Sequence, residues 1–370
     1  MTTIGINLTA CKSENLVGTW KYVKRHLMEM KHIDLNHYKF IFYIPSNINP
    51  SVFSIPSNCN HEIIYVLPIN NILFRFFYVQ TFFYFKLKKC DVLYSPDSLL
   101  PWFGKSQKVI SILDMYWYTH SQVYPWLKRN VGLLLTKIAI AKADKIITIS
   151  ESSKNDIIKL FKGVEDKLHF NYCFISNDEI ASFFSQYNAD NFNNTGNQYF
   201  LSVSSLQPIK NYDGLIKAFA LMQNKHPEYK LYIAGGTSDK AYSDKLHTIV
   251  HKYNLNTKVI FTGYISDAEI NKLYEGCFGI IMPSFYEGFG YAPLEGFYRN
   301  KSCVVSDVSS LPEVVGKAGV YVDPYNIQSI CDGMEELILN EKKYIQHIPE
   351  QIEKFNAKKL TQTFFKILTE

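Results

Sequence analysis

The sequence lacks the patterns that mark membrane-spanning and exported proteins. Its most apolar stretch, ILFRFFYVQTFFYFKL, is interrupted by Arg75, Gln80 and Lys86, so it falls short of the roughly 20 apolar residues that cross a bilayer. Residues 1–10 resemble a short strand and have neither the basic start nor the long apolar run of a signal peptide. We therefore expect a protein that is neither transmembrane nor exported.

Cysteine pairs and metal-binding strings are also missing. The seven cysteines are odd in number, lie far apart and form no C-x-x-C pair, which argues against a disulfide framework and a zinc site and favours a reducing, cytoplasmic compartment. No D-x-D string occurs, so no metal is expected to bridge carboxylates and a diphosphate. The sequence thus predicts no metal and no cofactor.

Neither sign of charge dominates. The 39 basic and 34 acidic residues give a net charge of +5, an excess too mild to indicate nucleic-acid binding but compatible with anionic ligands or an anionic membrane surface. A length of 370 residues with 47% hydrophobic content is enough for a packed protein of two domains.

Short apolar runs alternate with longer helical patterns along most of the chain. Alternation of this kind predicts βαβ units with parallel sheets. The strands are expected at residues 39–44, 91–95, 108–113, 145–149, 168–170, 199–204, 230–234, 258–262, 279–282 and 302–306. The polar stretch between residues 178 and 198 is typical of a linker. We predict one α/β domain at 1–185, a second at 198–350, and a C-terminal helix at 351–370 that packs on either domain.

The segment PSFYEGFGYAPLEG, residues 283–296, carries the most chemical information. It follows a buried strand and leads into a helix whose first turn is expected to hold Pro293. Gly288 and Gly290 lack a Cβ, so the backbone can approach a ligand closely, and unpaired N–H groups at a helix start favour a phosphate. The segment predicts an anion site that suits a diphosphate.

Two carboxylates flank this turn. Glu287 precedes the glycines and Glu295 follows eight positions later, in what we expect to be the first helical turn. Carboxylates accept well from sugar hydroxyls, and a vicinal diol offers two donors. The spacing alone is equally compatible with Glu295 simply favouring the positive end of the helix dipole.

Two other strand-to-helix turns contain weaker signals. Lys210, in LSVSSLQPIKNYDGLIKAF, lies where a cation would reach a phosphate, although an exposed lysine is the commoner explanation. Gly18, in LVGTWKY, would let a helix start approach a ligand, although an ordinary turn is again commoner.

Taken together, these segments resemble a known family. IIMPSFYEGFGYAPLEGF, followed by VVSDVSSLPEVVGKAGVYVDP, is similar to the donor-site signature of the retaining GT-B glycosyltransferases of the large group-one family. The likeness continues in VSSLQPIKN, FTGYISDAEINKLYEGC, DVLYSPDSLLP and ADKIITISESSKNDI, and so covers most of the chain in order. It implies a GT-B fold, in which two Rossmann-like domains with parallel sheets face each other across a cleft.

The resemblance also implies roles for individual residues. Glu287 would contact the transferred sugar, while Gly288, Phe289 and Gly290 would offer backbone N–H groups to the sugar and diphosphate. Lys210 would neutralise the β-phosphate as the nucleotide leaves.

Other implied roles concern the nucleotide. Glu295 would bind the ribose, Tyr264 and Ile265 would lie beside the nucleobase, and Gly18 would belong to a phosphate loop of the first domain. The donor would be a GDP-, UDP- or dTDP-linked sugar, and the acceptor a saccharide or lipid-linked saccharide in surface-polysaccharide or O-antigen assembly.

Two departures from the family pattern bear on activity. Where many relatives carry an arginine shortly before the lysine, this chain has Ile209 and two serines. Where many have His-Asp, it has Leu113-Asp114, so Asp114 or a nearby group such as His120 would have to compensate. These departures leave open a catalytically silent homologue that acts as a binding partner, beside other GT-B enzymes such as an epimerase or a phosphorylase.

The first domain has two segments in which apolar side chains mix with Arg and Lys, ILFRFFYVQTFFYFKLKKC and WLKRNVGLLLTKIAIAKADK. This composition occurs in helices that lie on anionic membranes, so peripheral contact with the inner face of a membrane is one interpretation. The commoner interpretation is that such helices pack on the sheet of their own domain.

Overall fold

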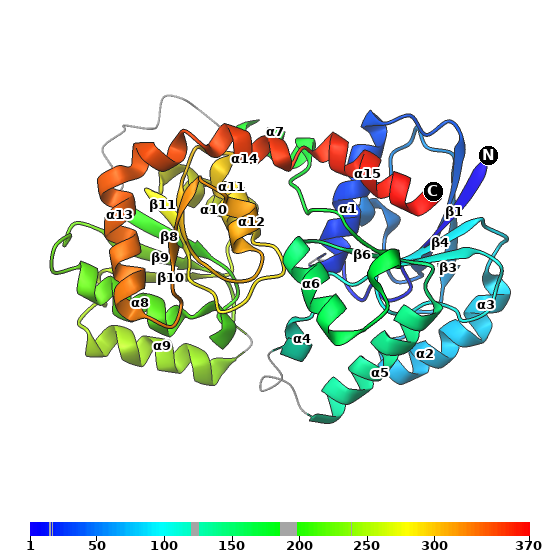
Figure 1. Cartoon of the computed structure of the whole chain (residues 1–370), viewed down its shortest axis with the longest axis horizontal. Helices are drawn as coiled ribbons and strands as arrows, with labels where there is room; N and C mark the ends of the chain where they lie inside the picture. The colour runs from blue at the N-terminus through cyan, green and yellow to red at the C-terminus, as the bar shows by residue number, and fades with distance from the viewer. Residues whose placement is uncertain (15, 17, 120–125, 186–197, 238) are drawn as a thin grey trace. The chain divides into compact units, whose positions relative to one another are not determined.

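The computed structural model describes the chain except for residues 15, 17, 120–125, 186–197 and 238. The described part forms two compact units. The first comprises residues 1–178 together with 356–370, and the second comprises residues 179–355. Figure 1 labels most of their helices and many of their strands.

The first unit contains a parallel sheet with strand order β3-β2-β1-β4-β5-β6-β7. The strands are β1 (Thr2–Asn7), β2 (Tyr38–Pro45), β3 (His61–Val66), β4 (Val92–Ser95), β5 (Gln107–Ser111), β6 (Lys145–Thr148) and β7 (Leu168–Phe170). The order reverses between β1 and β4, and Asn7 connects the ends of these two strands by donating from Nδ2 to Ser95 Oγ at 3.0 Å.

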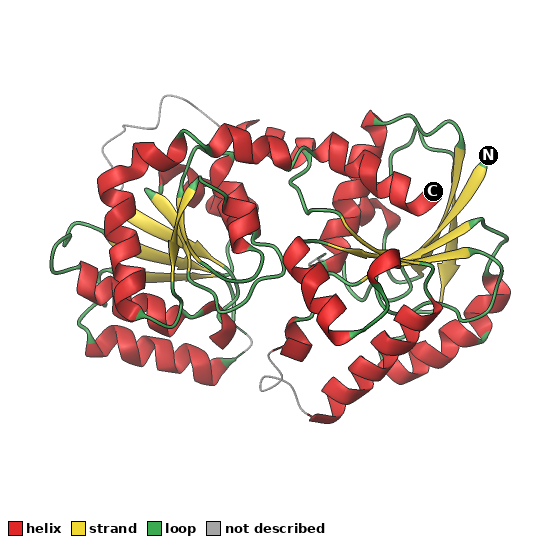
Figure 2. Cartoon of the chain, in the orientation of Figure 1, coloured by secondary structure: helices red, strands yellow, loops and turns green. Residues whose placement is uncertain are grey.

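Helices cover the strands of the first unit on both faces (Figure 2). They are α1 (Thr19–Glu29), α2 (Ile72–Gln80), α3 (Phe82–Lys86), α4 (Tyr116–Thr119), α5 (Trp126–Lys142), α6 (Glu151–Leu160) and α15 (Ala357–Thr369), with 3₁₀ turns η1 (Met30–His32), η2 (Pro50–Phe53) and η4 (Glu165–Lys167). Helix α7 (Asn177–Ser185) begins at the boundary between the units.

Helix α15 brings the end of the chain back to the first unit, where it packs on α1. The ring of Phe364 stacks on His26 at 4.1 Å between centroids, and Thr361 Oγ1 lies 3.1 Å from His26 Nδ1. Because His26 is buried among these groups, its pKa falls to about 3. A neutral imidazole therefore forms part of this helix interface.

The second unit repeats the architecture with strand order β10-β9-β8-β11-β12-β13, all parallel. Its strands are β8 (Tyr199–Val203), β9 (Lys230–Ala234), β10 (Val259–Gly263), β11 (Gly279–Met282), β12 (Cys303–Ser306) and β13 (Gly319–Val322). Its helices are α8 (Tyr212–Met222), α9 (Lys240–Lys252), α10 (Asp267–Gly276), α11 (Tyr291–Phe297), α12 (Leu311–Val315), α13 (Ile327–Ile345) and α14 (Ile348–Lys354), with the 3₁₀ turn η6 (Pro208–Lys210).

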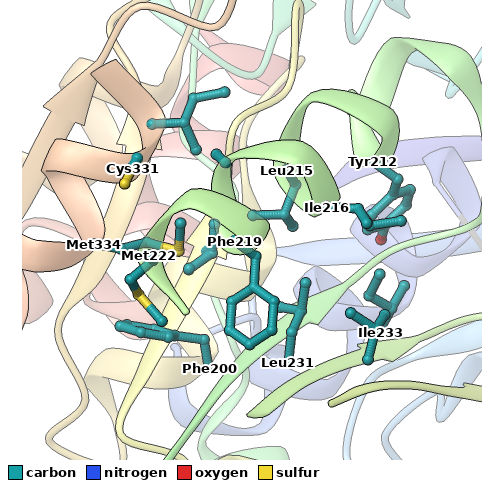
Figure 3. Close-up of a cluster of buried hydrophobic side chains, with 14 of the residues drawn as sticks. Phe200, Tyr212, Leu215, Ile216, Phe219, Met222, Leu231, Ile233, Cys331 and Met334 are labelled. Atoms are coloured by element: carbon teal, nitrogen blue, oxygen red, sulfur yellow. The ribbon is translucent and has the colours of Figure 1, made fainter. Parts of the chain in front are cut away.

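The core of the second unit lies between α8, α13 and the central strands, as Figure 3 shows. Phe219 and Met222 from α8 meet Leu231 from β9 and Met334 from α13, and all four are fully buried. Burial of side chains of this size contributes about 1.5–3 kcal/mol each, so the strand ends that carry the polar loops rest on a well-packed base.

All of the predicted strands form, with ends that differ by at most two residues, and the prediction of two parallel α/β sheets is confirmed. Strands β3 and β13 were not predicted. Each of them lies at an edge of its sheet, and β3, HEIIYV, is half-exposed. The second unit begins earlier than the predicted residue 198 because Phe183 of α7 packs under the guanidinium of Arg299, 3.7 Å from the ring centroid.

Candidate functional site

The polar loops of the second unit meet where its strand order reverses. Strands β8 and β11 are neighbours, and the loop after β8 carries Lys210 while the loop after β11 carries Glu287. Phe285 N donates to Ile209 O at 2.9 Å and so ties the two loops together. Crevices outside the carboxyl ends of parallel strands at such a reversal are the usual ligand sites of doubly wound sheets.

Lys210 and Glu287 form a bidentate ion pair at this position. Lys210 Nζ donates to Glu287 Oε1 at 2.7 Å and to Oε2 at 2.9 Å. The side chains are 19% and 10% exposed, so the pair is largely removed from water without being sealed. A cation and a carboxylate, predicted from separate motifs far apart in the chain, thus lie at one point.

Serines hold Glu287 and its loop in place. Ser284 Oγ donates to Glu287 Oε1 at 2.7 Å, and Glu287 N donates to Ser309 Oγ at 2.9 Å. Ser310 Oγ is shared between the carbonyl oxygens of Glu287 and Phe289, at 2.9 and 2.8 Å. Ser284 and Ser310 are buried, so these contacts are shielded from water.

Sequence reasoning assigned no role to these serines. Their signal was present in PSFYEG and VVSDVSS, two motifs that carried the family resemblance. The Ser284 bond stays within one loop, whereas the hydrogen bonds of Ser309 and Ser310 join two separate loops, and no spacing rule predicts such a contact.

The glycines of this turn play different structural roles. Gly290 has φ of +109°, a conformation that requires glycine, and a Cβ there would also crowd Leu311 Cδ2 at 2.8 Å. Gly288 and Phe289 form a bend between Glu287 and α11. The Phe289 side chain is buried and packs on Phe355, which leaves its backbone as the part available to a ligand.

Glu295 is the fifth residue of α11, and the expectation that it lies in the first turn was wrong. The helix begins at Tyr291, so Pro293 does fall in the first turn but Glu295 lies beyond it. A half-buried Glu295 accepts from Tyr274 Oη at 2.8 Å through Oε2. Burial, and then the neighbouring carboxylate, raise the pKa of Tyr274 well above its usual value, so the phenol remains a hydrogen-bond donor.

Tyr264 and Ile265 follow β10 on the carboxyl-end side of the same sheet. Tyr264 is 80% exposed, so its ring is available for stacking. Gly263 has φ of +67° and turns the chain directly before it. Gly236, which follows β9, lies beside Tyr264, since a Cβ on Gly236 would be 3.8 Å from Tyr264 Cβ.

The remaining predicted residues belong to the first unit. Gly18, with φ of +52°, is the N-cap of α1, and a Cβ there would meet no described atom within 4 Å, so its conformation alone favours glycine. Asp114 follows β5 and accepts from Tyr116 N at 3.0 Å. His120 lies outside the described residues.

A polar cavity, which the sequence did not predict, lies in the first unit between α2, α5 and the loop after β4. Its volume is about 220 Å³ and its lining includes Arg75, Asp97, Trp117 and Thr136. Arg75 is only 5% exposed, and although its Nη1 donates to Ala10 O, its Nε has no hydrogen-bond partner among the described residues. Burial raises the pKa of Asp97 to about 6.

Comparison with known proteins identifies the second unit. Residues 184–354 match the family model for "Glycosyl transferases group 1". Residues 184–354 thus form a domain similar to the group 1 glycosyltransferases. The resemblance expected from the sequence is therefore confirmed for the half that contains both Lys210 and Glu287.

Curated relatives match about half of this chain. It is 30% identical over 202 residues to the O-antigen chain mannosyltransferase B of Escherichia coli, which covers 52% of this chain and 51% of that protein. It is 29% identical over 217 residues to the serotype-specific mannosyltransferase WbdA of Escherichia coli, covering 55% of this chain and 25% of WbdA. The matches thus span between a quarter and about half of these relatives.

Solved structures extend the likeness to the whole chain at the level of fold alone. The Anabaena protein HepE, solved with UDP and glucose, superposes with a TM-score of 0.72 at 17% identity and full coverage of both chains. WaaG, a glycosyltransferase involved in lipopolysaccharide biosynthesis, superposes with a TM-score of 0.72 at 14% identity. The predicted GT-B class is confirmed by these neighbours.

Proposed function

We propose that this protein transfers a hexose from a nucleoside-diphosphate donor to a saccharide or lipid-linked saccharide acceptor in surface-polysaccharide assembly. The Lys210–Glu287 pair at the strand-order reversal, within the group 1 domain, is the observation that carries this proposal. Relatives named as O-antigen mannosyltransferases support the pathway, and a neighbour solved with UDP and glucose supports the donor class.

The chemistry of the pair suits a donor diphosphate. The ammonium group of Lys210 already donates to the carboxylate of Glu287, and a diphosphate would offer this group an acceptor with more negative charge. Once Lys210 turns to the phosphate, Glu287 keeps its bond from Ser284 and has acceptor capacity for sugar hydroxyls. The backbone of residues 288–290 supplies further donors without a side chain in the way.

We propose that transfer retains the configuration at the anomeric carbon. The bond from C1 to the diphosphate oxygen breaks, and an acceptor oxygen bonds to C1 on the same face. The acceptor proton passes to the leaving phosphate oxygen, while Lys210 stabilises the negative charge that develops there. The proposal needs no metal, and Glu287 orients the sugar and stabilises charge.

Glu295 and Tyr264 are proposed to select the nucleoside. Glu295, oriented by Tyr274, offers acceptor oxygens to a ribose diol, and the exposed Tyr264 ring and neighbouring Ile265 offer an apolar surface to the base.

The cavity of the first unit is proposed to take one sugar ring of the acceptor. Arg75 Nε supplies an unused donor, Asp97 supplies an acceptor, and Trp117 supplies an apolar wall. A sugar hydroxyl both donates and accepts, whereas a phosphate would be repelled by Asp97. At about 220 Å³ the cavity is smaller than drug-sized sites of roughly 300–1,000 Å³, which suits a single ring. Gly18 and Asp114 are proposed to contribute from the loops that follow β1 and β5.

The test is a thermal-shift titration of the full chain with GDP, UDP, dTDP and their hexose conjugates. Binding at a hundredfold excess over Kd adds about 2.7 kcal/mol and raises the melting temperature. We expect one nucleotide series to raise it, and expect Lys210→Ala and Glu295→Ala to lose that shift. Lys225→Ala, which removes an exposed lysine paired with Glu335, is the matched control and should keep it.

Turnover then separates the alternatives. Release of nucleotide that depends on an added saccharide acceptor supports a transferase, and release without an acceptor indicates another GT-B enzyme. If no nucleotide shifts the melting temperature, the protein is a silent homologue and the proposal is wrong.

A further inference from the structure

Helices α2 and α3 expose an unusual row of large apolar side chains, which we call the aromatic face. It consists of Leu73, Phe74, Phe77, Phe82 and Phe85, which are between 53% and 83% exposed. The two helices contact each other and follow one another in the chain, so the five side chains come from one continuous surface element. Exposed apolar groups in this density mark an interaction surface.

The opposite sides of the same helices explain why this face points outward. Tyr78, Val79 and Phe83 are buried and pack with the strand residues Tyr43 and Leu93. The helices therefore pack on their sheet, as one interpretation of the sequence held, but among their described aromatic side chains only Phe76, Tyr78 and Phe83 take part. The rest cannot turn inward without breaking these contacts.

The charge of this element points to one kind of partner. The segment 67–90 contains no Asp or Glu, and it contains Arg75, Lys86, Lys88 and Lys89. Arg75 is buried and Lys88 pairs with Glu62. Lys86 and Lys89 are exposed at the end of α3, and within the described residues neither forms an ion pair. The surface is thus apolar with a positive edge.

We propose that the aromatic face inserts into the interfacial region of an anionic lipid bilayer, with Lys86 and Lys89 at the level of the headgroups. Helices that lie in an interface bury one apolar side and carry lysine at its border, and anionic lipid attracts that lysine. None of the helices of the described chain is long and apolar enough to cross a membrane, so the contact would be peripheral.

This inference does not rest on the enzymatic proposal, since it concerns a surface of the first unit alone. It would add to that proposal a way of holding the protein beside a lipid-linked acceptor. The contact would also explain the peripheral membrane location that the sequence suggested, because the five side chains of the aromatic face would hold the protein at the lipid surface.

The experiment is co-sedimentation of the full chain with vesicles of phosphatidylcholine, either pure or mixed two to one with phosphatidylglycerol. We expect binding to the anionic vesicles, weakened by salt. Phe74→Ser with Phe77→Ser should lower the partition coefficient roughly tenfold per side chain. Lys86→Ala with Lys89→Ala should lower it roughly fivefold per charge on anionic vesicles alone.

Matched controls come from α13. Leu339 is 73% exposed and Lys342 is also exposed, so Leu339→Ser and Lys342→Ala change the same chemistry elsewhere and should leave partitioning unchanged. An unchanged melting temperature and an unchanged nucleotide-induced shift would show that the variants fold and that their donor site is intact.

Two results would overturn the inference. One is the absence of binding to anionic vesicles, or equal binding by the aromatic-face variants and the controls. The other is a concentration-dependent dimer in light scattering that Phe74→Ser with Phe77→Ser abolishes while vesicles remain unbound, which would assign the surface to a second copy of the chain.

Discussion

Replacing Lys210 by alanine should destabilise the second unit by about 1–3 kcal/mol. Removing one partner of a fully buried ion pair costs about 3–5 kcal/mol, and an exposed pair is worth about 0–1 kcal/mol. The Lys210 and Glu287 side chains are 19% and 10% exposed, which places this pair between those limits. Ser284 keeps one bond to the carboxylate and softens the loss.

A double-mutant cycle isolates the pair from other effects of the change. Lys210→Met and Glu287→Gln each leave one charge without its partner, whereas the double variant leaves none. We expect the double variant to lose less stability than the two single variants added together, with a coupling of about 1–2 kcal/mol.

Far-UV circular dichroism during urea and thermal unfolding provides the measurement. For a unit of this size, 1 kcal/mol shifts the melting temperature by about 2–4 °C. All four tryptophans lie in the first unit, so their fluorescence reports that unit and serves as an internal reference. Losses that add within about 0.5 kcal/mol, the scatter expected of independent sites, or an equal loss in Lys225→Ala, would refute the reasoning.

Three further predictions concern single residues. Burial raises the pKa of Asp97 from 3.8 to about 6, so the stability that its protonated form gives the fold is present below pH 3.8 and is lost as pH rises through 6. Asp97→Asn should therefore stabilise the fold at pH 7 by about 1–3 kcal/mol and have no advantage near pH 4. Urea unfolding at both pH values would reveal this difference. Tyr274→Phe should weaken nucleotide binding roughly three- to tenfold by releasing Glu295, measured by calorimetry, and an unchanged Kd would argue against the ribose contact. Gly290→Ala should cost about 1–3 kcal/mol through its positive φ, and a melting temperature equal to that of the parent would contradict the conformational argument.

Local patterns were sufficient to predict most strands and the turn that contains Glu287. Buried parallel strands are short apolar runs between turn residues, a signal that β11 (GIIM) and β12 (CVVS) carry in four residues each. The position of Glu295 was misjudged because Pro293 suggested a first helical turn that would also hold Glu295, whereas Gly290 already turns the chain and α11 begins at Tyr291. Helix starts depend on the φ of the preceding residue, and sequence rarely specifies that angle.

The surface of the first unit was harder to infer. A sequence as rich in aromatic residues as FFYVQTFFYF indicates that one side of its helices is buried, but not how many side chains that side accommodates. In the structure Val79 and Phe83 fill the space against the sheet, and Phe77 and Phe82 are left outside.

By itself the sequence determined the parallel α/β architecture, the family of the second unit and the motifs that hold Lys210, Glu287 and Glu295, because each depends on residues close together in the chain. The tertiary structure decided that Lys210 and Glu287 form an ion pair and that Ser310 donates a hydrogen bond to the loop that leads from Glu287 to α11. It also decided which aromatic side chains face solvent. Such contacts join residues separated by dozens of positions, and only the packing of strands and helices sets the distances between them.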